Sequence, residues 1–177
     1  MWRVNRIFQY NCFWHHFLVY YHKLKIMNTG ITLEVSTVIH APVHKVWEAL
    51  TKPEIIKQYF FNTDTYTDWT PGHPIIFKGE WEGKHYEDKG TVIDVKKNEL
   101  IRFTYWSSMS GRADIPENYV LVSYEVSGKD NDLTLTVTQE NIPDEKMKAH
   151  AEENWTKVLK GLKKLLEWQI KPEEKYV

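Results

Sequence analysis

The sequence has little of what several functional classes require. Its single cysteine excludes an intrachain disulfide and zinc sites built on two or four cysteines. No apolar run approaches the roughly 18 residues of a membrane-spanning helix. With 23 Lys and Arg against 24 Asp and Glu, the chain lacks the basic excess that favours nucleic acid. We therefore expect a cytoplasmic protein that binds neither nucleic acid nor a membrane.

The motifs of common enzyme classes are also missing. The chain has no G-x-S-x-G elbow, no phosphate-binding G-x-x-x-x-G-K loop, no H-E-x-x-H zinc motif and no dinucleotide fingerprint. His40 and His44 are four residues apart, but a proline between them excludes His40 from the helix that would carry a shared metal. We expect no metal, no cofactor and no catalytic residue, while acid–base chemistry by His85, Tyr86 or Glu80 stays open.

The length of 177 residues suits one domain with a sizeable core, but the composition is uneven. Residues 1–26 hold four basic residues, no acid and eight of the aromatic residues, which leaves 19 basic against 24 acidic residues, a net charge of −5, for residues 27–177. We interpret residues 1–26 as an N-terminal extension outside the fold, with Met27 as the natural start. The alternative is a basic, aromatic helix on anionic lipid.

Hydrophobic periodicity predicts an α+β domain over residues 27–177. Residues 31–40 alternate as a half-buried strand does, and two short helices, a polar loop at 62–73 and a run of strands follow. We place these strands at 75–82, 85–96, 99–107, 117–127 and 132–141. Apolar residues at helical spacing predict a long helix from Pro143 to about residue 170. The order favours helices gathered on one side of a strongly curved antiparallel sheet.

Three segments carry a resemblance to a known family. Residues 39–54, IHAPVHKVWEALTKPE, have its Ala-Pro, Val-Trp-x-Ala-Leu-Thr and Pro-Glu at the same spacing. GTVIDV at 90–95 with LIRFTYW at 100–106 is similar to its central hairpin, and QENIPD at 139–144 to the start of its last helix. The chain resembles the START-like (SRPBCC) helix-grip superfamily, in the branch named for the activator of heat shock protein 90 ATPase.

The resemblance implies a curved antiparallel sheet of about six strands around a long C-terminal helix, with two short helices after the first strand. It also implies, in many members, a cavity for an apolar ligand between sheet and helix. The aromatic surplus of this chain suits such a cavity for a small apolar or aromatic molecule, although the same rings can simply fill a core. We expect the lining to be Trp47, Tyr59, Phe60, Trp69, Phe77, Trp81, Phe103, Tyr105, Tyr119, Asn154, Trp155 and Val158.

Some residues near this cavity have two interpretations, one functional and one purely structural. His150 and Asn154, four apart, place hydrogen-bonding groups at its edge or lie on a solvated helix flank. Gly161 lies inside the long helix, where a glycine lowers helix stability by about 1 kcal/mol relative to alanine. Close approach of a ligand or a strand would explain a glycine at this position. The alternative is that the glycine is merely tolerated. A solvated rim near the turns is expected for Glu80, Glu82, Glu87 and Asp88.

Three functions follow as hypotheses. The favoured one is noncatalytic binding of a small hydrophobic ligand. The family name implies instead that the protein binds or stimulates a heat shock chaperone, although the full activator resembles a two-domain protein and residues 1–26 are too short for its N-terminal domain. The third is a cyclase- or hydrolase-like enzyme, which needs two titratable groups within hydrogen-bond reach in a deep pocket.

Overall fold

The computed structural model describes residues 30–170, so the predictions for residues 1–26 lie outside the described part. The strands are β1 (Ile31–His40), β2 (Asp64–Tyr66), β3 (Pro74–Trp81), β4 (Lys84–Lys96), β5 (Leu100–Tyr105), β6 (Val120–Lys129) and β7 (Asp132–Ile142). The helices are α2 (Val43–Thr51), α3 (Pro53–Tyr59) and α4 (Glu145–Ile170), with a short 3₁₀ turn, η1, at Pro116–Asn118.

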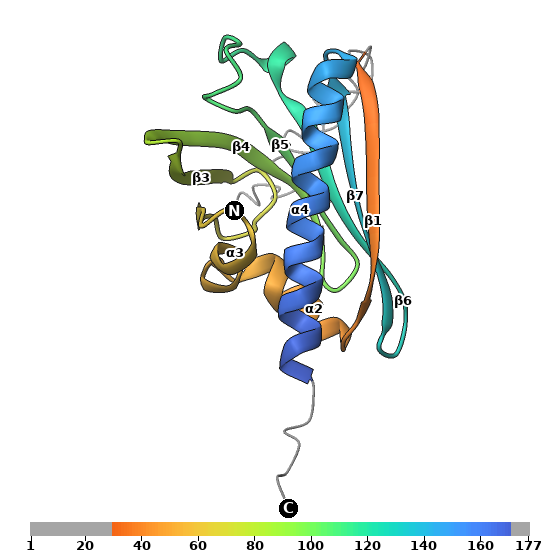
Figure 1. Cartoon of the computed structure of the whole chain (residues 1–177). Coiled ribbons are helices and arrows are strands. Elements are labelled where there is room, and N and C mark those ends of the chain that lie inside the picture. The colour runs from red at the N-terminus through yellow and green to blue at the C-terminus, as the bar shows by residue number, and fades with distance from the viewer. Residues whose placement is uncertain (1–29, 171–177) are drawn as a thin grey trace, which may run out of the picture.

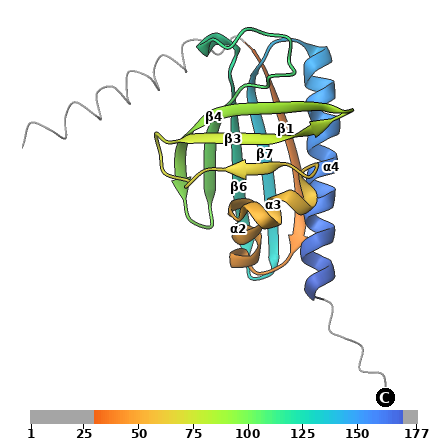
Figure 2. The ribbon, with the colours of Figure 1, turned by 90° about the vertical axis from the view of Figure 1, so that its left-hand side faces the viewer.

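The strands form one antiparallel sheet in the order β1-β7-β6-β5-β4-β3-β2. From β2 to β7 each strand pairs with the next one along the chain, and β1 then pairs with β7. The sheet curves strongly, so that β3 and β4 cross the direction of β6 and β7 (Figure 2). Helix α4 runs alongside β1 and β7 (Figure 1). This is the predicted α+β helix-grip fold.

Alternating burial explains why the first strand was predictable. Leu33 and Ile39 are buried, whereas Glu34 and Val38 between them are exposed, as expected for a strand with one face on the core. The strand ends at His40, and Pro42 precedes α2 as its N-cap residue. The two short helices follow where the sequence places them.

One strand was not predicted. Residues 62–73 read as a loop, but β2 lies within them and pairs with β3, with Thr65 opposite Phe77. A strand of three residues is too short to show a period of two. The sheet therefore has seven strands where the sequence indicated about six.

Strand β4 bends where it passes from one neighbour to the other. Its first half pairs with β3, and its second half pairs with β5 after a register shift between Val92 and Asp94. Gly90 lies at the bend, where a Cβ atom would overlap the backbone carbonyl oxygen of Thr104 on β5. The absence of a side chain at Gly90 lets the two backbones come this close.

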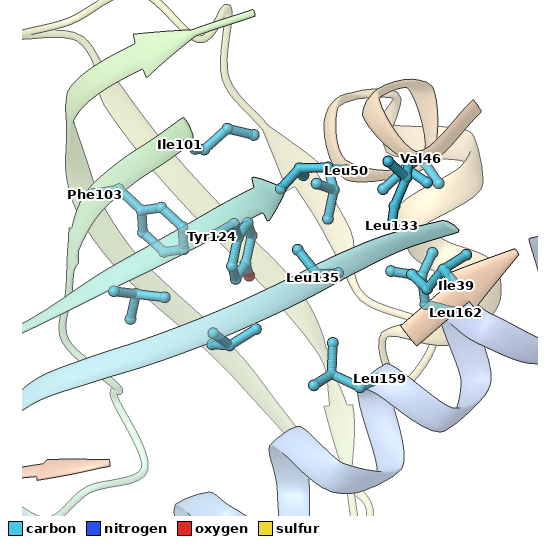
Figure 3. Packing of buried hydrophobic residues seen from close by; sticks show 14 of the residues in the cluster. Ile39, Val46, Leu50, Ile101, Phe103, Tyr124, Leu133, Leu135, Leu159 and Leu162 are labelled. Atoms are coloured by element: carbon cyan, nitrogen blue, oxygen red, sulfur yellow. The ribbon is translucent and has the colours of Figure 1, made fainter. Parts of the chain in front are cut away.

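The two halves of α4 have different surroundings. In its C-terminal half Leu159, Leu162 and Leu166 are buried in the main hydrophobic core. Figure 3 shows Leu159 and Leu162 near Leu135 and Ile39 of the sheet, and residues of α2 belong to the same cluster. The nearest atoms to a Cβ at Gly161 belong to Tyr59 of α3, at 3.4 Å, rather than to a strand. The N-terminal half of α4 lies over the cavity described below.

No helix among residues 30–170 combines the length and apolar character needed to cross a bilayer.

Candidate functional site

A cavity of about 420 Å³ lies between the sheet and the N-terminal half of α4. Its floor comes from β3 to β7, and its sides come from residues 60–63 and 107–110. The loop between β5 and β6, which contains residues 107–110, lies near the first turns of α4 (Figures 1 and 2). The volume falls within the range of about 300–1,000 Å³ typical of small-molecule sites.

Five aromatic rings around this cavity form a closed cycle of contacts, which we call the aromatic collar: Phe60, Phe77, Phe103, Tyr124 and Trp155. Successive ring centroids around the cycle are 6.0, 5.9, 5.5, 5.7 and 5.8 Å apart. Phe60 and Phe77 are stacked, the other four pairs are tilted or edge-on, and all five separations are favourable for aromatic pairs. The indole Nε1 of Trp155 also donates a hydrogen bond to Gln139 Oε1 at 2.8 Å, which fixes the ring over the sheet. The collar is therefore held in place by contacts among its own rings and by the hydrogen bond to Gln139.

A buried carboxylate lies beside the collar. Asp88 of β4 lines the cavity and is only 6% exposed. The Tyr105 hydroxyl donates to Asp88 Oδ2 at 2.5 Å, and the backbone N–H and hydroxyl of Ser108 donate to Oδ1 at 2.8 and 3.0 Å. The Tyr105 ring in turn lies edge-on to Phe77, with the centroids 5.9 Å apart. Burial, and then the nearby Asp88 charge, raise the pKa of Tyr105 well above its ordinary value, so its hydroxyl stays a donor.

Other polar groups line the cavity singly or in pairs. The hydroxyls of Thr63 and Tyr86 are hydrogen bonded at 2.7 Å, and the side chains of His150 and Asn154 meet at 3.1 Å. The Tyr124 hydroxyl makes no hydrogen bond to any residue in the described part of the chain, although Tyr124 is only 9% exposed. Burial raises the pKa of Tyr124 well above its ordinary value. The cavity therefore has an apolar wall with a few hydrogen-bonding groups.

Exposed lining residues mark the opening of the cavity. Phe61, Trp81 and Met109 are 37%, 49% and 47% exposed. Phe61 and Trp81 pack edge to face with centroids 5.9 Å apart. Phe61 has a φ of 51°, a left-handed conformation that costs a bulky residue roughly 1–3 kcal/mol. The strain at Phe61 accompanies the placement of its ring at the opening, next to Trp81.

The structure places most of the expected lining residues at this cavity. The eight that line it are Phe60, Phe77, Trp81, Phe103, Tyr105, Asn154, Trp155 and Val158. The other four lie elsewhere: Trp47 packs against the main core, and the polar atoms of the remaining three are engaged outside the cavity. Tyr59 donates to the Ala49 carbonyl at 2.9 Å, Trp69 to the Thr51 carbonyl at 2.8 Å and Tyr119 to Asp114 at 2.7 Å.

The solvated rim was a wrong prediction for Asp88. Glu80, Glu82 and Glu87 are exposed as expected, but Asp88 is buried at the cavity. The signal for this was the period of β4, because Asp88 is in phase with Tyr86 and with the buried Val92, whereas Glu87 is not. The lining residues that the sequence prediction left out are Phe61, Thr63, Tyr86, Asp88, Tyr124 and Gln139, among others.

The histidines at the β3–β4 hairpin each lie beside a different carboxylate. His73 pairs with Asp68 at 2.8 Å, and His85 lies 4.0 Å from Glu80 on the exposed end of the β3–β4 hairpin. The pairing of β3 with β4 places these two histidines at opposite ends of the hairpin. Within the described residues, no group of three or more His, Cys, Asp or Glu side chains is arranged to hold a metal ion.

Comparisons with known proteins agree with this architecture. The solution structure of a protein from Cytophaga hutchinsonii is 42% identical, with a TM-score of 0.69, and the match covers 80% of this chain and 97% of that one. A crystal structure from Mesorhizobium loti matches at 20% identity and a TM-score of 0.65, over 78% and 98% of the two chains. The Aha1 dimer from Colwellia psychrerythraea matches at 21% identity and a TM-score of 0.62, over 77% and 96%. The last two matches concern the fold alone.

A comparison with curated proteins gave no match. A family model described as activator of Hsp90 ATPase homolog 1-like protein matches residues 40–167, from the end of β1 to the last turn of α4. This range includes the whole cavity and covers more than half of the chain. The chain therefore belongs to the family of activator of Hsp90 ATPase homolog 1-like proteins, within the helix-grip (SRPBCC) fold.

Proposed function

We propose that this domain binds a small hydrophobic ligand with an aromatic or comparably flat body in the cavity between the sheet and α4, without catalysing a reaction on it. The observation that carries the proposal is the aromatic collar around a cavity of about 420 Å³. A core residue of this kind is ordinarily packed against neighbours on every side, whereas each of these rings has one side on the cavity. Such a wall gains dispersion and hydrophobic energy when an apolar molecule replaces water.

Filling the cavity with a side chain tests this proposal. Ala151 of α4 lines the cavity, and Ala151→Trp puts an indole into the space that the ligand would take. Naphthylethanol serves as a neutral aromatic probe, for which we expect a dissociation constant around or below about 1 mM with the wild-type protein. Ala151→Trp is expected to weaken binding at least about tenfold, or 1.4 kcal/mol, in isothermal titration calorimetry.

Ala149→Trp is the matched control. Ala149 lies on the same helix, is exposed and does not line the cavity, so the same substitution there leaves the affinity for naphthylethanol unchanged. Thermal unfolding of both variants shows whether each one is folded. Equal affinity of Ala151→Trp and the wild-type protein would place the probe elsewhere and contradict the proposal. Native mass spectrometry of the purified protein then identifies any ligand that it retains.

A chaperone role is the second candidate, and the family description supports it. A protein with this role raises the ATP hydrolysis rate of the Hsp90 from its own organism. We expect the effect, if present, to be independent of Ala151→Trp, because a surface that contacts a protein is separate from the cavity interior. An ATPase assay without stimulation at saturating concentrations of the domain removes this candidate.

An enzymatic role is the third candidate, and Asp88 with Tyr105 is the observation that favours it. These are two titratable groups within hydrogen-bond reach at a cavity, at 2.5 Å. Because its pKa is raised, Tyr105 acts at neutral pH as a hydrogen-bond donor rather than as a base. Turnover of a bound compound that Tyr105→Phe abolishes, while binding persists, is the result that would favour catalysis over binding alone.

A further inference from the structure

The charge of the cavity wall is unusual for an apolar pocket. Asp88 is the single acidic side chain of the lining, and no Lys or Arg from the described part of the chain belongs to it. His150 is the lone basic member, and it lies at the exposed edge, hydrogen bonded to Asn154 at 3.1 Å. Asp88 also forms no ion pair with a described lysine or arginine, in contrast to its neighbour Glu87, which pairs with Lys78 at 2.8 Å. The wall therefore presents a carboxylate without a cation.

Asp88 has capacity for one more hydrogen bond. Its Oδ1 accepts from the backbone N–H and hydroxyl of Ser108, and its Oδ2 accepts from Tyr105. An ionised carboxylate has about four acceptor sites, so one site on Oδ2 is left. Burying a carboxylate is costly unless hydrogen bonds and an opposite charge compensate it. The hydrogen bonds are present in this structure, and the opposite charge is the part that a ligand would bring.

Another polar group in the cavity has no hydrogen-bond partner among the described residues. The hydroxyl of Tyr124, a member of the collar that is 9% exposed, makes no hydrogen bond within the described residues. A hydroxyl accepts as well as donates, so it is a further acceptor for an N–H group. The aromatic faces of the collar attract a cation electrostatically, through the negative face of each ring. The carboxylate, the free hydroxyl and the ring faces therefore all favour a ligand that carries a positively charged N–H donor.

We propose that the ligand is a hydrophobic amine, bound as its ammonium ion with the charged nitrogen at Asp88 and the apolar body within the aromatic collar. This inference rests on the proposed function and adds the chemical class of the ligand. An alkylammonium group, like the lysine side chain, keeps its proton up to about pH 10, so it is charged under ordinary conditions. A carboxylate ligand is disfavoured by repulsion from Asp88, and a neutral alcohol forms the hydrogen bond without the charge attraction.

Three probes of similar shape separate the effect of ligand charge from the effect of the apolar body. Naphthylethylamine, naphthylethanol and naphthylacetate carry a positive, a neutral and a negative group on the same ring system. In calorimetry at pH 8 the wild-type protein is expected to bind the amine at least about tenfold more tightly than the alcohol. The acetate is expected to bind most weakly. Asp88→Asn keeps the size of the side chain and is expected to bring the amine and the alcohol to within about twofold of each other.

Glu87→Gln is the matched control, because it removes the same charge from the adjacent, exposed position outside the cavity. It leaves the preference for the amine unchanged. Equal binding of the amine and the alcohol by the wild-type protein, or an equal loss of preference in Glu87→Gln, overturns the assignment to Asp88. Absence of binding by all three probes contradicts the proposed function itself. Should Asp88→Asn fail to fold, the order of the three probes on the wild-type protein still decides the ligand class.

Discussion

Gly90→Ala is expected to destabilise the domain by about 3 kcal/mol or more, at or beyond the upper end of overpacking costs. A Cβ atom at Gly90 would overlap the Thr104 carbonyl oxygen and lie 2.6 Å from its carbon, and both are backbone atoms that no rotamer change can move away. Separating β4 from β5 at this point breaks the hydrogen bonds between Lys89 and Trp106, at 3.1 and 2.8 Å. It also breaks the bond from the Thr91 N–H to the Thr104 hydroxyl, at 2.9 Å.

The comparison variant for this experiment is Gly161→Ala. Its Cβ would meet Tyr59 atoms at 3.4 Å and beyond, which is ordinary contact, and alanine favours a helix interior by up to about 1 kcal/mol over glycine. Urea unfolding is therefore expected to give midpoints that move in opposite directions for the two variants. A Gly90→Ala midpoint within experimental error of the wild type would show that β4 can bend at this position without the glycine.

A steep loss of stability above pH 10 is the second large effect that we expect. Burial raises the pKa of Tyr59 and Tyr124, and burial with the Asp88 charge raises that of Tyr105. In the unfolded chain these phenols ionise near pH 10, whereas in the folded protein they stay protonated well above it. Each such group costs about 1.4 kcal/mol of stability per pH unit, so the three together cost about 4 kcal/mol per unit.

The sign of this effect follows from proton binding. Above pH 10 the folded state holds more protons than the unfolded state, so a rise in pH favours unfolding. The stabilisation is complete below pH 10 and is lost as the pH rises toward the raised folded-state values. With a total stability of about 5–15 kcal/mol, the domain is expected to unfold within roughly two or three pH units.

The free energy of unfolding from urea titrations between pH 8 and 11 measures this slope. Tyr124→Phe is expected to reduce the slope above pH 10 by about a third, because one of three buried phenols is removed. That variant gives up no hydrogen bond within the described residues. Tyr66→Phe, at a ring that is 54% exposed, is the control and leaves the slope as in the wild type. A flat profile up to pH 11 would contradict the burial of the three hydroxyls.

The fold could be predicted because burial follows the periodicity of the sequence. Leu33 and Ile39 alternate with exposed residues in β1, and Leu159, Leu162 and Leu166 recur at helical spacing in α4. Where an element is too short for its period to repeat, as the three-residue β2 is, the pattern carries no information. The resemblance to the family added the closure of the sheet around the helix, which periodicity alone does not determine.

The cavity could be predicted only in part, because composition does not distinguish a ring at a cavity from a ring in a core. Phe103 and Tyr59 are both aromatic residues, but only Phe103 reaches the cavity, whereas Tyr59 is held by the Ala49 carbonyl. That difference depends on the bend in β4 and on the packing of α3, which are long-range features. Asp88 was assigned to the solvated rim because acidic residues are rarely buried, although its phase in β4 indicated the inner face.

The two halves of helix α4 contribute to different parts of the domain. Leu159, Leu162 and Leu166 belong to the core, whereas Met147, Ala151 and Asn154 belong to the cavity wall and contribute little to that cluster. Substitutions in the first turns of α4 are therefore expected to change the shape of the cavity with a small effect on folding. Such a helix allows the cavity to change while the architecture stays the same.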